Sequence, residues 1–206
     1  MDEYNKMIQG LLYDANDPFL DKKRKETQKL CNKYNNTGEG DIKKRDKILK
    51  KLMPDKAESA FLRGPIHFDY GFNTTMGDFS YANFNFTVLD VCKVNIGKHV
   101  YMGPNVTILT AMHPFSYKQR NMYFDKQKNY YTDKEYGKPV TIKDNCWICS
   151  NVTILPGVTI GSGCVIGAGS VVTKDIKDNM LAYGNPCKEI KEIDQEEKEQ
   201  YEKDIY

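Results

Sequence analysis

The stretch IKDNCW ICSNVT ILPGVT IGSGCV IGAGSV VTK, residues 142–174, repeats with a period of six. An aliphatic side chain opens every block, at Ile142, Ile148, Ile154, Ile160, Ile166 and Val172. Neither the period of about 3.6 residues of an α-helix nor the alternation of a strand explains this spacing. One short strand and one tight turn per block explain it, and hexapeptide repeats of this kind indicate a parallel β-helix.

The same spacing continues upstream in a weaker form. Counting back in sixes from Ile108 gives Met102, Ile96, Asp90, Phe84, Asp78 and Phe72. A second series, four residues after each of these positions, stays apolar or small: Met76, Ala82, Val88, Val94, Val100, Val106 and Met112. Ile108 and Ile142 are 34 residues apart, which is not a multiple of six. We therefore expect an excursion loop to leave the coil over residues 113–138. A loop of that length in a compact fold is commonly functional.

Composition and charge narrow the classes of function. The chain has 206 residues and a formal net charge of +2, so charge alone does not indicate a nucleic-acid partner. Its first residues lack the apolar segment of a signal peptide, and no apolar run approaches the ~20 residues that cross a bilayer. Six cysteines without a disulfide framework favour the cytoplasm. Cys146 and Cys149 have CxxC spacing, but inside a regular repeat we interpret them as coil residues, and we expect no metal.

The pattern divides the chain into three parts: a helical N-terminal region over 1–60, a β-helix over 61–188 with its excursion loop at 113–138, and a C-terminal helix over 189–206. Within the first part, Asp17 followed by Pro18 predicts an N-cap and a first helical position. Asp41 is a second expected cap. The predicted fold class is therefore mainly β, with helices at both ends of the coil.

Histidine is the first candidate for proton transfer. His99 is expected in a surface turn of the coil, and His67 in the lead-in strand is ambiguous. His113 lies where the coil opens and the excursion begins. Asp133 and Glu135 close the same excursion, so a carboxylate there could return to the imidazole and fix its tautomer, as general-base catalysis requires. The excursion is also rich in aromatic residues, which suit either a lid over a sugar ring or a cover for a neighbouring subunit.

Six motifs extend over nearly the whole chain: LYDANDP at 12–18, YANFN at 81–85, MHP at 112–114, EYGKP at 135–139, IGAGSVVTKD at 166–175 and GNPC at 184–187. In these motifs the chain resembles the maltose and galactoside O-acetyltransferases. The resemblance implies a left-handed parallel β-helix of triangular section and a homotrimer with its active site between subunits. It also implies transfer of acetyl from acetyl-CoA to a sugar hydroxyl, such as one of maltose, glucose or a galactoside.

The resemblance also implies roles for particular residues. His113 would be the general base, Glu135 would orient it, and Asn83 would position the imidazole or the acceptor. The residues lining the acceptor site would be Asp14, Asp69, Tyr81 and Asn83. The residues following the coenzyme from its thioester to its phosphates would be Trp147, Ser150, Ala168, Thr173, Lys174, Lys188 and Lys191.

Two departures from the family pattern concern the acceptor and the thioester slot. Cys149 stands where the family usually has Gly, and the excursion is longer than in the bacterial maltose enzymes. Other readings remain. The same coil could acetylate an antibiotic, serine or a nucleotide sugar. A zinc lyase of the γ-class carbonic anhydrase type would need three converging His ligands. A non-catalytic or ice-binding scaffold would show outward Thr ladders, and beyond Thr153 and Thr159 we expect none.

Overall fold

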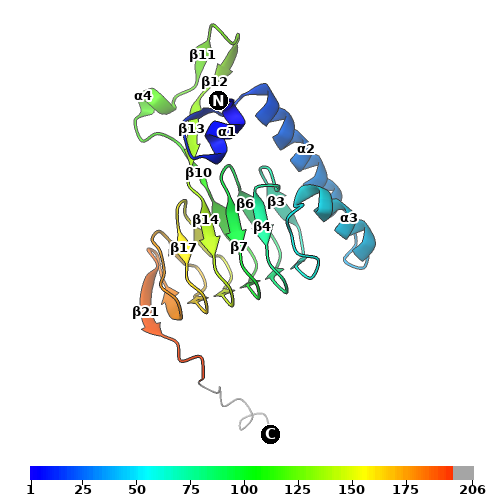
Figure 1. The fold of residues 1–206 in the computed structure, drawn as a ribbon, viewed down its shortest axis with the longest axis vertical. Coiled ribbons are helices and arrows are strands. Elements are labelled where there is room, and N and C mark those ends of the chain that lie inside the picture. Colours follow the sequence, from blue (N-terminus) through cyan, green and yellow to red (C-terminus); the bar gives the residue numbers. More distant parts are fainter. Residues whose placement is uncertain (197–206) are drawn as a thin grey trace.

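Three parallel sheets run along the body of the molecule and meet at its corners, so the chain winds as a β-helix of about six turns (Figure 1). The computed structural model of the chain describes residues 1–196. The mainly β fold and the parallel β-helix predicted from the hexads are confirmed.

Each face of the β-helix stacks one strand from every coil. The first face contains β4 (Thr74–Met76), β7 (Val94–Ile96), β14 (Val140–Ile142) and β17 (Thr159–Ile160). The second contains β2 (Phe61–Leu62), β5 (Tyr81–Ala82), β8 (Tyr101–Met102), β15 (Trp147–Ile148), β18 (Val165–Ile166), β20 (Met180–Tyr183) and β21 (Lys188–Glu192). The third contains β3 (Ile66–Phe68), β6 (Phe86–Leu89), β9 (Thr107–Leu109), β16 (Thr153–Ile154) and β19 (Val171–Val172).

The aliphatic residue that opens each hexad points into the coil. Ile142, Ile148, Ile154, Ile160, Ile166 and Val172 are all at most 1% exposed. Each lies in register with the equivalent residue one coil away, as Ile142 does with Ile96 and with Ile160. Burying one such side chain contributes about 1.5–3 kcal/mol, so the period of six is the sequence signature of this core.

One corner of the coil is wider in the N-terminal half than in the C-terminal half. Tyr81 pairs with Tyr101, so that coil takes 20 residues, whereas Trp147 pairs with Val165 and takes 18. The extra residues lie between the third and the first face. We call this edge the wide corner; it contains residues 69–73, 90–93 and 110–139.

The series that counts back in sixes from Ile108 therefore gives the wrong inward positions upstream of Ile96, because the register shifts by two residues at this corner. The inward positions there are Met76, Ala82 and Val88, which pair with Ile96, Met102 and Ile108. Phe72, Asp78, Phe84 and Asp90 lie between strands. The physical reason lies in Asp90, a fully buried carboxyl that accepts hydrogen bonds from the Tyr70 N–H at 2.8 Å and from the Thr74 hydroxyl at 2.9 Å. These bonds fix a broader turn, which needs two more residues.

The outward side chains differ between the faces. On the third face Thr87, Thr107 and Thr153 stack in register, so a threonine ladder does exist, contrary to expectation. It was hidden in the sequence because the coil length changes from 20 to 18 residues and the excursion interrupts it. The second face is apolar: its outward column is Phe61, Tyr81, Tyr101, Trp147, Val165 and Leu181.

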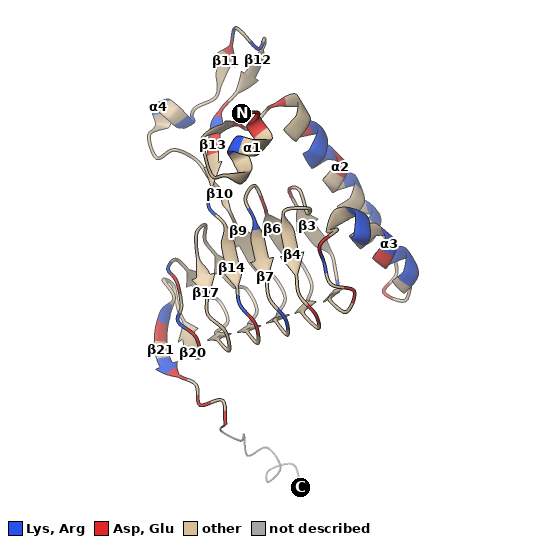
Figure 2. Ribbon diagram, viewed as in Figure 1, with Lys and Arg blue, Asp and Glu red and all other residues tan. Residues whose placement is uncertain are grey.

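The N-terminal region is helical, as predicted, with α1 (Glu3–Ile8), α2 (Pro18–Asn35) and α3 (Ile42–Leu52). Asp17 caps α2 by accepting hydrogen bonds from the N–H groups of Phe19 and Leu20. Asp41 is the N-cap residue of α3 but makes no capping bond with its side chain. Helices α2 and α3 cover the N-terminal end of the coil (Figure 1), and Figure 2 shows basic residues along both helices. Most of these basic side chains are exposed, whereas Arg45 is buried.

The excursion leaves the coil at the wide corner and lies beside α1 (Figure 1). It contains β10 (Ala111–Met112), α4 (Tyr117–Arg120), the hairpin of β11 (Tyr123–Asp125) and β12 (Tyr130–Thr132), and β13 (Lys134–Gly137). Strand β13 pairs with β10 on one side and with β1 (Tyr13–Asp14) on the other. Gly10 adopts the left-handed region with φ +72, and a Cβ there would lie 2.6 Å from the Gly137 carbonyl oxygen, so a glycine is needed for this close approach.

The sequence predicts a C-terminal helix over 189–206, and this prediction is wrong for the described part of that range, residues 189–196. Lys188–Glu192 forms β21, which folds back antiparallel onto β20. The edge of the second face would otherwise present unpaired backbone groups, and β21 covers it. Residues 197–206 lie outside the described residues. Within 1–196, no helix is long and apolar enough to cross a membrane.

Candidate active site

His113 follows β10 at the point where the excursion leaves the wide corner. Its Nε2 lies 3.7 Å from Oε1 of Glu135, and its Nδ1 lies 3.7 Å from Oδ2 of Asp133. The imidazole is 45% exposed, while the two carboxylates are 18% and 21% exposed. The side chain therefore presents its ring to solvent between two half-buried acids. The sequence prediction that Glu135 returns to His113 agrees with this geometry, and Asp133 joins it.

Tyr13 holds Glu135 from behind. Its hydroxyl donates a hydrogen bond to Oε2 of Glu135 at 2.5 Å, and the tyrosine is fully buried. Burial and the neighbouring charge of Glu135 raise the pKa of Tyr13, so it remains a donor. Tyr13 and Glu135 are also register partners between β1 and β13. Oε2 is thus occupied, and Oε1 is left facing the imidazole.

Asp69 lies on the same corner and is half-buried. Burial raises the pKa of Asp69 to about 6 although Arg24 opposes the shift, and the charge of Glu135 raises it further. Arg24 donates hydrogen bonds to the Ala15 carbonyl at 2.7 Å and to the Tyr70 hydroxyl at 3.1 Å. The expected acceptor-site position of Asp69 is therefore compatible with its place near Glu135.

Asp14 does not line an accessible site, contrary to the prediction. Its carboxylate is fully buried and accepts hydrogen bonds from Lys128 at 2.5 Å, from Tyr130 at 2.8 Å and from Thr132. The Asn16 N–H fills a fourth position at 3.1 Å. Burial alone would raise the pKa of Asp14, but the hydrogen bonds from Lys128, Thr132 and Tyr130 outweigh it and lower the pKa. The excursion supplies these donors, which surround the Asp14 carboxylate and leave it without solvent exposure.

One group of described residues has the spacing of a metal site: His113, Asp133 and Glu135, whose candidate ligand atoms all lie within 4.8 Å of one another. The same arrangement suits an imidazole that exchanges a proton, because a carboxylate beside a ring nitrogen can accept its N–H and fix the tautomer. His67 and His99 lie on other parts of the coil, so the three His residues do not converge.

Several predicted site residues lie on a different corner from His113. Asn83 follows β5, between the second and the third face, and its side chain accepts a hydrogen bond from the Phe84 N–H at 2.8 Å. Ser150 and Ala168 lie two and three coils further along the same edge. Tyr81 and Trp147 point outward from the second face, where Tyr81 stacks on Phe61 with ring centroids 6.0 Å apart. A single chain therefore does not bring this group to His113.

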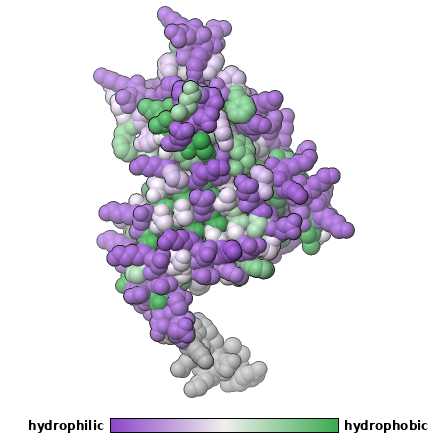
Figure 3. Space-filling view, in the orientation of Figure 1, coloured by the Kyte–Doolittle hydropathy of each residue, from purple (hydrophilic) through white to green (hydrophobic). Residues whose placement is uncertain are grey.

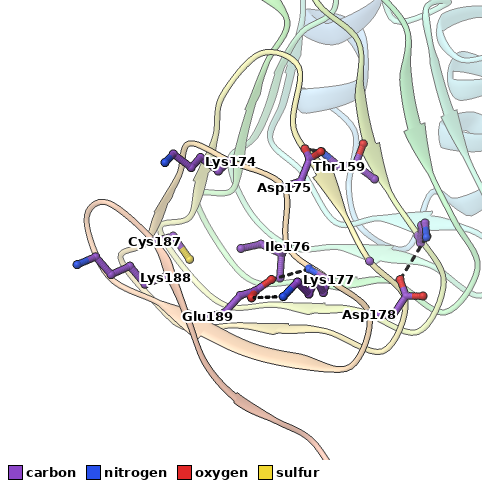
Figure 4. A pocket seen from close by; sticks show the side chains of 11 residues that line it. Thr159, Lys174, Asp175, Ile176, Lys177, Asp178, Cys187, Lys188 and Glu189 are labelled. Carbon is purple, nitrogen blue, oxygen red and sulfur yellow. Dashed lines mark hydrogen bonds and ion pairs between the residues drawn. The ribbon is translucent and has the colours of Figure 1, made fainter.

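A cavity of about 790 Å³ lies at the C-terminal end of the coil and is lined by Lys174 and Lys188 among others (Figure 4). Two further lysines in its lining are ion-paired, Lys143 with Asp178 at 3.2 Å and Lys177 with Glu189 at 3.8 Å. Lys174 and Lys188 form no ion pair with any described residue, and Figure 4 shows both side chains reaching away from the carboxylates. Thr173 precedes Lys174 in the same exposed turn, whereas Lys191 does not line this cavity.

Sequence reasoning singled out neither Tyr13 nor the three donors to Asp14. Tyr13 stood inside the LYDANDP motif, but nothing marked it as the partner of a residue 122 positions away. Lys128, Tyr130 and Thr132 are spaced by two, which is the strand signal that could have placed them on one side of a hairpin.

Comparisons with known proteins agree with this architecture. The family model "Maltose acetyltransferase hexapeptide capping motif" matches residues 6–56, and "Bacterial transferase hexapeptide (six repeats)" matches residues 139–174. The galactoside O-acetyltransferase of Escherichia coli is 40% identical over 185 residues, which cover 90% of this chain and 86% of that protein.

Two solved structures are similar over almost the whole chain. A maltose O-acetyltransferase from Clostridium difficile 630 has a TM-score of 0.84 at 43% identity, covering 95% of this chain and 99% of that one. A galactoside acetyltransferase in complex with coenzyme A has a TM-score of 0.85 at 36% identity, covering 99% and 97%.

The coil, its repeat and the site on its excursion define a hexapeptide-repeat transferase. The chain belongs to the maltose and galactoside O-acetyltransferase family and is an acetyltransferase of that type.

Proposed function

We propose that the protein transfers the acetyl group of acetyl-CoA to a hydroxyl of a sugar such as maltose, glucose or a galactoside. The observation that carries the proposal is the position of His113, which lies where the excursion leaves the coil and has a carboxylate 3.7 Å from each ring nitrogen. The names of the similar proteins, a maltose and a galactoside acetyltransferase, support the sugar as acceptor. The complex with coenzyme A supports the donor.

In the proposed reaction His113 is the general base. A sugar hydroxyl is a poor nucleophile at neutral pH, and the imidazole takes its proton as the oxygen attacks the thioester carbonyl. The C–O bond of the ester forms, the C–S bond breaks, and the proton passes to the departing coenzyme thiolate. No acyl-enzyme is needed, because holding both substrates side by side supplies much of the acceleration.

The two carboxylates have separate tasks in this proposal. Glu135 accepts the Nε2–H of His113, which leaves Nδ1 to take the hydroxyl proton. Asp133, beside Nδ1, stabilises the imidazolium that forms. Both distances of 3.7 Å are longer than a hydrogen bond and are expected to shorten when the substrates bind.

The oxyanion of the tetrahedral intermediate needs a donor, and we assign the backbone N–H of Ser150 to it. This N–H donates no hydrogen bond to any of the described residues, whereas its neighbours Cys149 and Asn151 donate to Ile166 and Pro104. An unpaired N–H at a half-buried corner is suited to meet developing negative charge. Trp147 and Ala168, on the same part of the coil, would line the path of the coenzyme, and Lys174 and Lys188 would meet its phosphates.

We infer a homotrimer because the site is divided between two corners of one chain. His113 lies on the wide corner, while Asn83 and Ser150 lie on the next edge. A second copy can bring its Asn83 edge to the first copy's His113 around a three-fold axis. The apolar outward column of the second face supports burial against a neighbour, since Phe61, Tyr101 and Trp147 are 39%, 50% and 55% exposed in one chain.

An acceptor screen tests the proposed activity. Acetyl-CoA is supplied with maltose, glucose, galactosides, chloramphenicol, serine or a nucleotide sugar, and the free thiol is measured. We expect turnover with a sugar. His113→Ala should lower kcat by a factor of roughly 10²–10⁴ and change the KM for acetyl-CoA little. Full activity of His113→Ala as an intact trimer would overturn the mechanism, and an active monomer in sedimentation would overturn the shared site.

A chelation experiment distinguishes proton transfer from metal chemistry at the same three residues. Turnover that survives chelation is the expected result, whereas activity lost on chelation and restored by zinc would assign a metal to His113, Asp133 and Glu135. The six free cysteines support a reducing compartment such as the cytoplasm.

A further inference from the structure

The carboxylate of Asp14 is surrounded by donors from a segment more than 100 residues away. Oδ2 accepts from Lys128 and Tyr130, and Oδ1 accepts from Thr132. All three donors belong to one short stretch, residues 128–132: Tyr130 and Thr132 lie on one side of β12, and Lys128 lies in the turn that precedes it. The bonds therefore join the hairpin β11–β12 to the N-terminal segment.

The same anchor continues into the strand that carries the catalytic carboxylates. Thr132 ends β12, Asp133 follows it, and β13 begins at Lys134. Asp14 pairs with Lys134 between β1 and β13, and the Ala15 N–H donates to the Asp133 carbonyl at 3.5 Å. Asp14 thus fixes the chain on both sides of Asp133.

Glu3 closes the network from α1. Its carboxylate accepts a hydrogen bond from the Asp14 N–H at 2.7 Å and lies 3.8 Å from Nζ of Lys128. Lys128 is therefore held by two acids, and its hydrogen bond to Asp14 raises its pKa above the usual lysine value. The lysine therefore remains charged, and its ammonium group lies between the carboxylates of Asp14 and Glu3.

We propose that Asp14 is a positioning residue, which with Lys128 clamps the excursion hairpin so that Asp133 and Glu135 stay beside His113. This role rests on the proposed function, and it takes the place of the expected contact between Asp14 and the acceptor. The clamp acts on the part of the excursion where the chain returns to the coil. Breaking the bonds of Asp14 would therefore let Asp133 and Glu135 move away from the His113 imidazole.

Three variants test the clamp: Lys128→Met, Asp14→Asn and the two together. Lys126→Met is the matched control, because Lys126 is exposed on the same turn and forms no bond with any described residue. Chymotrypsin cleavage in the excursion, at Tyr117, Tyr123 or Phe124, is the readout of the clamp, since the lysine changes do not remove these sites. We expect cleavage roughly tenfold faster in the test variants and unchanged in the control.

The second readout is the position of the acids. We expect the ring-proton NMR signals of His113, assigned with His113→Asn, to shift in Lys128→Met but not in Lys126→Met. With an active acceptor, turnover should fall by roughly ten- to a hundredfold while the constant for acetyl-CoA is unchanged. Because Asp14→Asn changes a buried group and can fail to fold, Lys128→Met, whose side chain is 34% exposed, carries the decisive comparison.

The cleavage, NMR and activity measurements test the clamp, the positioning role and the proposed function separately. Unchanged cleavage in Lys128→Met overturns the clamp, whether or not the protein acetylates sugars. Faster cleavage with unchanged His113 signals overturns the positioning role. If the wild-type protein acetylates no acceptor in the screen, the proposed function fails, and cleavage with the NMR signals still decides whether Asp14 positions the acids.

Discussion

The hydroxyl of Tyr13 lies 2.5 Å from Oε2 of Glu135, and these two residues are also register partners between β1 and β13. A buried side chain at the N-terminus therefore sets the direction of a carboxylate on the excursion. Removing the hydroxyl leaves Glu135 free to rotate away from His113.

Tyr13→Phe tests this relationship. We expect turnover to fall by roughly tenfold, because the imidazole keeps its place but loses its fixed partner. The KM for acetyl-CoA should be unchanged, since Tyr13 is fully buried behind Glu135 and offers no surface to the coenzyme. Tyr136→Phe is the control and should behave as wild type, because Tyr136 lies beside Glu135 on β13 and its hydroxyl forms no hydrogen bond with any described residue. Equal turnover in Tyr13→Phe and wild type would show that Glu135 needs no support.

Lys174 and Lys188 should carry most of the phosphate binding. They are the two cavity lysines without an ion pair among the described residues, whereas Lys143 and Lys177 are neutralised by acids. The double variant Lys174→Ala, Lys188→Ala should raise the KM for acetyl-CoA and leave the KM for the acceptor unchanged. The KM for acetyl-CoA should also depend less on salt than in the wild type. Lys191→Ala should have a smaller effect, because Lys191 does not line the cavity. An effect of equal size in Lys191→Ala would move the phosphate site along β21.

Cys149 should be replaceable by Gly. Its N–H bonds to Ile166 at 2.9 Å, and it is absent from the positive-φ residues of the described chain, so no glycine conformation is required there. The half-buried side chain would narrow the proposed thioester path beside Ser150, so Cys149→Gly should keep the fold and maintain or raise turnover. Bound zinc in the purified protein, lost together with activity in this variant, would instead assign Cys146 and Cys149 to a metal.

Asp90 should make stability depend on pH. Burial raises the pKa of Asp90 to about 7, above its usual value near ~4 in the unfolded chain. The folded state thus keeps a proton that the unfolded state loses, and between about pH 4 and pH 7 this group destabilises the fold as pH rises. The cost is about 1.4 kcal/mol for each unit of raised pKa. Asp90→Asn should remove this pH dependence relative to wild type in denaturant titrations, and parallel curves for the two proteins would contradict the shift.

The sequence was most informative where one periodicity held. The inward aliphatic residues of 142–174 each occupy the same place in a coil, so local spacing alone located the core. Upstream, the spacing of sixes failed at Asp90, because a buried carboxyl widens the corner and a count along the chain cannot detect its hydrogen bonds. The same change of coil length concealed the threonine ladder.

The site was predicted in part. His113 and Glu135 could be paired because both flank one loop, so chain connectivity limits their separation. Asp14 was misassigned because its burial depends on donors of the excursion hairpin, more than 100 residues away, which the LYDANDP motif does not contain. The C-terminal helix was predicted from charge, but pairing with β20 outweighed helix propensity over Lys188–Glu192.

The wide corner has a consequence for how this protein can change. Two extra residues per coil, a helix and a hairpin all occupy that one edge, while the strands on either side keep their partners. Lengthening the chain there costs little loop entropy and disturbs no stacked aliphatic residue. The edge is therefore a natural position for exchanging loops of different length, and a graft that replaced the excursion could alter the choice of acceptor while the donor groove is inherited intact.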